Sequence, residues 1–75
     1  MKPLHKLSPR KRGRVVALTT DGNMRRRLQD LGIIEGTSVQ KLYTAPLGDP
    51  SAYRVRGVAI ALRKKDADTI YIQEK

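Results

Sequence analysis

The sequence predicts a mostly β protein with one short helix, in which a single sheet closes into a small barrel. Five short runs rich in β-branched and aliphatic residues and one segment with helical spacing carry this prediction. The chain has 75 residues, so it buries only about 60% of its unfolded surface and holds one compact core. It contains no Cys, Trp or Phe, so Val, Ile and Leu supply that core.

The first strand is expected at about Arg14 to Leu18, where β-branched residues lie between polar ones. The period then changes, because Met24, Leu28 and Leu31 recur at helical spacing and therefore share one helical face. We expect this face to plug one side of the barrel.

Small polar and glycine residues mark the ends of this helix. Asp21 or Asn23 is placed to cap its start, and Gly32 suits the left-handed conformation common after a helix C-terminus. Gly36 turns the chain into a second strand over residues 37–44. Alternate residues of a strand share a face, and here Lys41 would share one with Val39, so its stem is expected along a sheet edge.

The last third of the chain predicts a hairpin, one helical or 3₁₀ turn and a closing strand. Gly57 divides residues 53–62 into two strands, as a tight turn or a bulge. Residues 63–69 are polar, and Ile70 and Ile72 then face inward from the final strand. Closure hides sheet edges economically, so we expect an SH3-like barrel of about five strands spanning residues 1–75.

The stretch Ala45–Pro50, APLGDP, is stiff for a connection between strands. Pro46 and Pro50 fix their own φ and restrict the residue before each, and Gly48 accepts a positive φ. A loop with little freedom loses little on binding, which suits a recognition element, although a well-made turn explains the same residues. The turn and cap residues of the chain are Gly32, Gly36, Pro46, Gly48 and Gly57, and the loop residues expected to contact a partner are Leu47, Asp49 and Pro50.

Sixteen basic and seven acidic residues give a net charge of +9, which attracts nucleic acid, an anionic membrane surface or an acidic partner. Basic residues cluster over residues 2–14 and at Arg25 to Arg27, as solvated surface or as a polyanion site. Residues 1–12 are expected to be basic and partly flexible. No apolar window is long enough to span a membrane and no secretory leader is recognisable, so a reducing cytoplasm is expected.

The sequence favours a protein that is not an enzyme. His5 is the only histidine, the acidic residues are scattered, and no phosphate-binding glycine motif occurs, so neither a metal site nor a cofactor is predicted. RNA binding is the alternative function, since small basic barrels bind single strands on aromatic platforms. Only Tyr43, Tyr53 and Tyr71 supply rings, and such strand tyrosines are commonly packing residues.

Four segments together resemble the ferrous iron transport protein A family, FeoA. They are PL..L.P..RGRVV.L, MRRRLQDLGIIEGT, APLGDP and VRGVAIALRKKDAD, and they cover nearly the whole chain in order. The resemblance implies a cytoplasmic SH3-like accessory of the ferrous iron permease, a membrane transporter with a cytosolic G-protein domain, at the inner face of the cell membrane. Iron would then pass through the permease.

The resemblance carries over to individual positions. Leu28, Leu31, Gly32 and Gly36 match the family's helix end and turn, residues 46–50 match its loop, and Arg63 and Lys64 match its strand exit. Two features depart from it: Lys41 stands where an inward apolar residue would be usual, and the basic run near the start is heavy. That run leaves room for a contact with anionic headgroups.

Two functions follow as hypotheses. In the first, the protein docks on the permease through Leu47, with Arg26 or Arg27 pairing with acidic groups of the partner. In the second, the N-terminal segment and the arginine cluster bind RNA or another polyanion. The sequence leaves the oligomeric state open.

Overall fold

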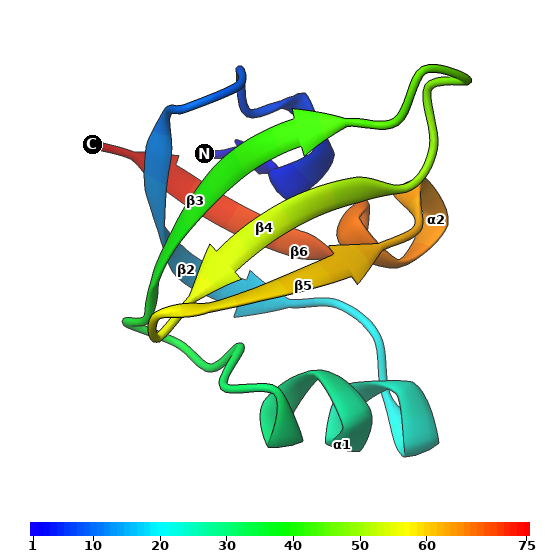
Figure 1. Ribbon diagram of the computed structural model, residues 1–75. Helices are drawn as coiled ribbons and strands as arrows, with labels where there is room; N and C mark the ends of the chain where they lie inside the picture. Colours follow the sequence, from blue (N-terminus) through cyan, green and yellow to red (C-terminus); the bar gives the residue numbers. More distant parts are fainter.

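The computed structural model describes residues 1–75 and shows one antiparallel sheet of six strands, in the order β1-β6-β2-β3-β4-β5 (Figure 1). The sheet curls around a single core, with α1 lying across one end. The elements in chain order are β1 (Lys2–Pro3), η1 (Leu4–Lys6), β2 (Arg12–Leu18), α1 (Gly22–Asp30), β3 (Ser38–Thr44), β4 (Ser51–Val55), β5 (Val58–Leu62), α2 (Lys64–Ala67) and β6 (Ile70–Glu74).

The N-terminal segment belongs to the core. Lys2 and Pro3 pair with β6, and the 3₁₀ turn η1 follows directly. Leu4 and Leu7 are fully buried. The segment expected to be partly flexible therefore contributes two core residues that the sequence pattern does not reveal. β1 was not predicted, so the sheet has six strands where about five were expected.

Helix α1 covers less of the core than its apolar spacing suggests. Leu28 is buried and Met24 is half-buried, but Leu31 keeps 39% of its surface exposed, so the expectation that all three plug the barrel is wrong for Leu31. The helix stops as predicted, because Gly32 has a φ of +96°, which a side chain rarely tolerates. Asp21 stands at the N-cap position without a side-chain hydrogen bond.

Lys41 points into the barrel. β3 lies between β2 and β4, so it has no free edge, and Lys41 sits opposite the buried Tyr53 with only 7% of its own surface exposed. The expected position of its stem along a sheet edge is therefore wrong. A register irregularity follows between Lys41 and Tyr43.

The β4–β5 hairpin turns on Arg56 and Gly57, which both have positive φ. The predicted tight turn is present, but β4 ends at Val55, one residue earlier than expected. The remaining turn glycines, Gly36 and Gly48, also have positive φ.

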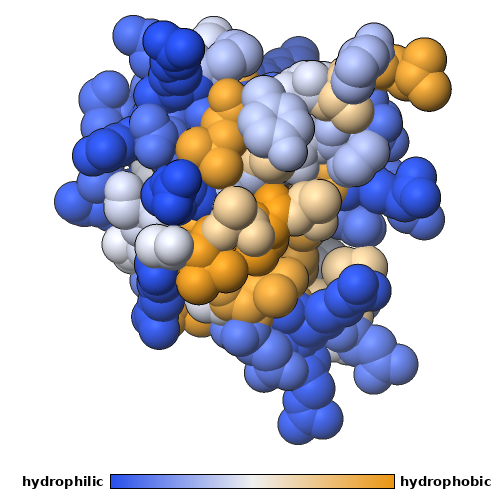
Figure 2. Space-filling view, in the orientation of Figure 1, coloured by the Kyte–Doolittle hydropathy of each residue, from blue (hydrophilic) through white to orange (hydrophobic).

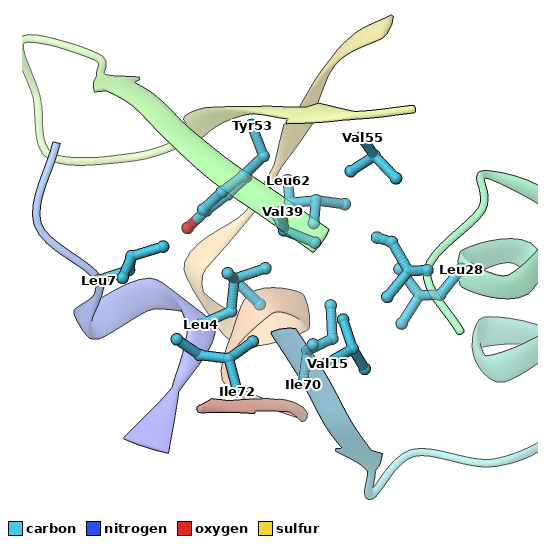
Figure 3. Close-up of a cluster of buried hydrophobic side chains, with 12 residues drawn as sticks. Leu4, Leu7, Val15, Leu28, Val39, Tyr53, Val55, Leu62, Ile70 and Ile72 are labelled. Carbon is cyan, nitrogen blue, oxygen red and sulfur yellow. The ribbon is translucent and has the colours of Figure 1, made fainter. Parts of the chain in front are cut away.

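The core brings together side chains from almost every element (Figure 3). Ile70 and Ile72 face inward from β6, as predicted. Tyr53 is fully buried, and its hydroxyl points toward the side of the core where Leu7 lies (Figure 3). The buried cluster is Leu4, Leu7, Val15, Leu28, Ile33, Val39, Tyr53, Val55, Leu62, Ala67, Ile70 and Ile72.

Candidate protein-interaction surface

The β3–β4 loop presents one apolar side chain at its tip. Leu47 is 97% exposed, and Figure 2 shows a hydrophobic side chain there that stands apart from the rest of the apolar surface. Backbone hydrogen bonds close the loop beneath it, from the Ala45 N–H to the Pro50 carbonyl at 2.9 Å and from the Gly48 N–H to the Ala45 carbonyl at 2.8 Å. The predicted anchor therefore stands on a fixed loop.

Asp49 ties this loop to the rest of the protein. Its Oδ1 accepts a hydrogen bond of 2.8 Å from the backbone N–H of Lys64, at the start of α2. The bond from Asp49 to Pro50 is cis. Asp49 is a predicted partner contact, and in the structure its carboxylate already has a hydrogen-bond partner within the chain.

A groove of about 320 Å³ lies between α1 and the end of β5. Arg27 and Pro50, both predicted contact residues, line this groove, whereas Arg26 and Leu47 lie outside it. The structure thus brings two of the five predicted contact residues together. The groove is lined by Met24, Arg27, Leu28, Leu31, Pro50, Ala61, Leu62, Arg63 and Asp66.

Strand β5 adds an exposed apolar edge that is not among the predicted site residues. It is the last strand of the sheet, and Val58 is 60% exposed. Figure 2 shows hydrophobic side chains gathered over β5 and toward α1. The run VAIAL carries a signal for this edge, because it is apolar on both faces. A strand with only one face in the core needs apolar residues on that face alone.

The predicted arginine cluster divides by role. The Arg25 guanidinium donates hydrogen bonds to the carbonyls of Leu18 and Thr20, at 3.0 and 3.3 Å, and so fastens α1 to the end of β2. Arg26 and Arg27 take part neither in the Lys2–Glu74 ion pair nor in the contact between His5 and Asp68. Both charges therefore remain available to a partner.

The three tyrosines do not form one stacking platform. Tyr53 is in the core, where burial raises the pKa of its hydroxyl, while Tyr43 is 63% exposed and Tyr71 is half-buried. Stacking of successive bases needs ring faces on a common surface.

No group of three or more His, Cys, Asp or Glu side chains is arranged to hold a metal ion. His5 Nδ1 lies 3.3 Å from Asp68 Oδ1, which makes the only His–carboxylate pair. No helix in the structure has the length and apolar character needed to cross a membrane.

These features define the class of the protein: a small SH3-like β-barrel with a fixed apolar loop and an apolar edge. The chain belongs to the FeoA domain family, whose model matches residues 2–74. A curated relative is the "Fe(2+) transport protein A/Fe(2+) transporter FeoB fusion protein" of Porphyromonas gingivalis, 30% identical over 59 residues. That alignment covers 79% of this chain and 7% of the relative, so the chain spans a small part of the relative's length.

Solved structures agree with the fold. The FeoA protein of Chlorobium tepidum is 34% identical, with a TM-score of 0.90 over 99% of this chain and 70% of that one. Stenotrophomonas maltophilia FeoA, described as an SH3 domain protein and solved with zinc, has a TM-score of 0.82 over 93% of this chain and 87% of that one, at 24% identity. The SH3-like fold and the family predicted from the sequence are confirmed.

Proposed function

We propose that this protein is a non-enzymatic accessory factor of ferrous iron uptake, which works in the cytoplasm by docking on the cytosolic part of the ferrous iron permease at the inner face of the membrane. The observation that carries the proposal is the Porphyromonas gingivalis relative, in which an Fe(2+) transport protein A and an Fe(2+) transporter FeoB form one fusion protein. Fusion raises the effective concentration of one module near another, which is useful where the two modules act together.

The surface supports docking through an apolar anchor and nearby positive charge. Leu47 is almost fully exposed and sits on a loop held by Asp49 at α2, so binding costs little loop ordering. Arg27 lines the neighbouring groove, and Arg26 lies on the same helix. An acidic and apolar surface of the permease would match this arrangement, with Leu47 buried and the arginines at the rim.

The experiment places a photo-crosslinking amino acid at Leu47 in cells and identifies the captured proteins by mass spectrometry. We expect capture of the ferrous iron permease. The same crosslinker at Gln73, an exposed residue near the end of β6, serves as the control and should capture far less permease. Capture of ribosomal or RNA-associated proteins at Leu47 would overturn the proposal in favour of polyanion binding.

Substitution tests the same anchor. Leu47→Asp should weaken association with the permease about thirtyfold or more, because an anchor lost from an interface costs about 2 kcal/mol or more. Unfolding free energy should change by less than about 0.5 kcal/mol, since Leu47 packs on nothing. Leu47→Met keeps an apolar anchor and should bind normally; equal binding by the Asp variant would show that Leu47 is not the anchor.

The alternative function, binding of RNA or another polyanion, has the net charge of +9 in its favour and the position of Tyr53 against it. Such binding should weaken steeply with salt, in proportion to the phosphates neutralised.

A further inference from the structure

A second cavity, of about 310 Å³, lies beneath the β3–β4 loop, and no hydrophobic residue lines it. Side chains from four elements meet there: η1, β3, β4 and α2. η1 contacts α2, and in Figure 1 both lie behind the ends of β3 and β4 from which the loop rises. The residues that matter are His5, Lys6, Lys41, Thr44, Ser51 and Lys64.

Lys41 is the most buried charged side chain that lines this cavity. It is more than nine-tenths buried, yet it forms no ion pair. Its Nζ donates one hydrogen bond, of 2.8 Å, to the His5 carbonyl, so two of its three N–H groups remain for another acceptor. Burial of the side chain lowers the pKa of the Lys41 ammonium, and no carboxylate offsets this effect.

Further positive charge converges on the same place. Lys6 and Lys64 line the cavity and form no ion pair with any carboxylate. Burial is the largest cause that lowers the pKa of His5. Asp68 raises this pKa, and the positive charges of Lys64, Lys41 and Lys6 lower it further. Two carboxylates lie close by, Asp68 beside His5 and Asp49 bonded to the backbone N–H of Lys64, but neither lines the cavity. The cavity walls therefore carry three ammonium groups.

A pair of hydroxyl groups completes the donor set. Thr44 Oγ1 and Ser51 Oγ lie 2.9 Å apart, and only one of them can donate to the other. The second hydroxyl hydrogen can point toward a bound acceptor or toward the buried Tyr53 hydroxyl, with which Ser51 also interacts.

We propose that this cavity binds a small phosphate-class oxyanion, held by the Lys41 ammonium and a hydroxyl of the Thr44–Ser51 pair, with Lys6 and Lys64 at its mouth. Donors arriving from four elements surround a tetrahedral anion better than a planar carboxylate. A dianion also balances more of the charge of three ammonium groups than a carboxylate does. The ligand is free phosphate or the phosphate monoester end of a larger molecule. Gly48 of the loop that carries Leu47 also lines the cavity, but anion binding here does not depend on docking.

The test titrates ¹⁵N-labelled protein with inorganic phosphate at constant ionic strength and neutral pH, using chloride as the balancing anion. We expect saturable amide shifts confined to residues around Lys41, Thr44 and Ser51. Lys41→Met should weaken the phosphate affinity about tenfold or more, because a charge-assisted hydrogen bond is lost. A parallel titration with glycerol 3-phosphate distinguishes the two sources, since tighter binding than inorganic phosphate indicates a monoester.

Lys11→Met is the matched control, because it removes one exposed charge outside the cavity and should leave the affinity within about twofold. Equal weakening in both variants, or shifts spread over the basic surface without saturation, would overturn the proposal. Spectral dispersion reports whether Lys41→Met is folded. If that variant does not fold, Thr44→Val combined with the exposed Lys64→Met replaces it and must weaken binding for the proposal to stand.

Discussion

Lys41 occupies an inward position on β3 where an apolar side chain would pack without electrostatic cost. Strand alternation places it beside Val39, but the preference of a charge for water argues against that face, so the sequence alone favours an edge. The inward position is feasible because the ammonium reaches the carbonyl of His5 in η1. The contact between η1 and β3 forms only when the N-terminal segment folds back onto the sheet, and no local sequence pattern predicts that.

His5 should make stability depend on pH. Burial is the main cause that lowers its pKa below the ordinary value of 6.5, with Lys64, Lys41 and Lys6 adding to that effect and Asp68 opposing it. The unfolded chain therefore binds the proton more readily than the folded protein does. Stability should fall as pH drops below about 6.5 and become level at neutral pH, since the histidine is then neutral in both states.

Urea unfolding over about pH 5 to 8 measures this dependence, and NMR titration of the single histidine gives its pKa directly. His5→Gln carries no titrating group in that range and should flatten the profile. A histidine that titrates above 6.5, or a profile unchanged in the variant, would contradict this assignment.

At the scale of elements, the segments bounded by turn and cap residues of their own were predictable. Gly32 ends α1, and Gly57 marks the β4–β5 hairpin, because positive φ leaves a strong local signal. β1 and η1 were not predictable, since Leu4 and Leu7 lie among charged residues without strand alternation. The residues just before them, Lys2 and Pro3, pair with β6 at the other end of the chain, and this pairing brings both leucines to the core.

Gly13 shows a constraint between elements that its local sequence does not reveal. It lies in β2 opposite Val39 of β3 and Glu74 of β6, and an added Cβ would stand 2.6 Å from Ile72 Cδ1. Ile72 is fully buried, and its Cβ would also lie only 3.2 Å from the added atom, so the Ile72 side chain would have to shift within the core. Gly13→Ala should therefore reduce the unfolding free energy by about 1–3 kcal/mol.

Chemical denaturation of this variant measures the loss, with Arg12→Ala as the control. Arg12 is an exposed neighbour on the same strand, and its substitution should change stability by less than about 0.5 kcal/mol. Similar values for the two variants would mean that the sheet accommodates the methyl group by moving Ile72.

At the scale of the whole molecule, the candidate docking surface joins parts of the chain that are far apart in sequence. The loop and Leu47 were predictable as an exposed, stiff connection. The groove was not, because it needs α1 beside the end of β5 with Leu31 left uncovered. Helical spacing places Leu31 on the apolar face of the helix but does not show how much of its side chain the barrel covers.

The net charge of +9 should act on the rate at which this surface meets the permease. If Arg26 and Arg27 flank the docking site, reversing both to Glu should slow association about tenfold at low salt and change dissociation much less, because unburied charges steer the encounter. Added salt should reduce the difference, since screening removes the steering. Surface plasmon resonance with the cytosolic part of the permease, over a series of salt concentrations, separates the two rates. Arg12→Glu with Arg14→Glu makes the same change in net charge on β2, so equal slowing there would mean that overall charge, and not the α1 face, guides docking.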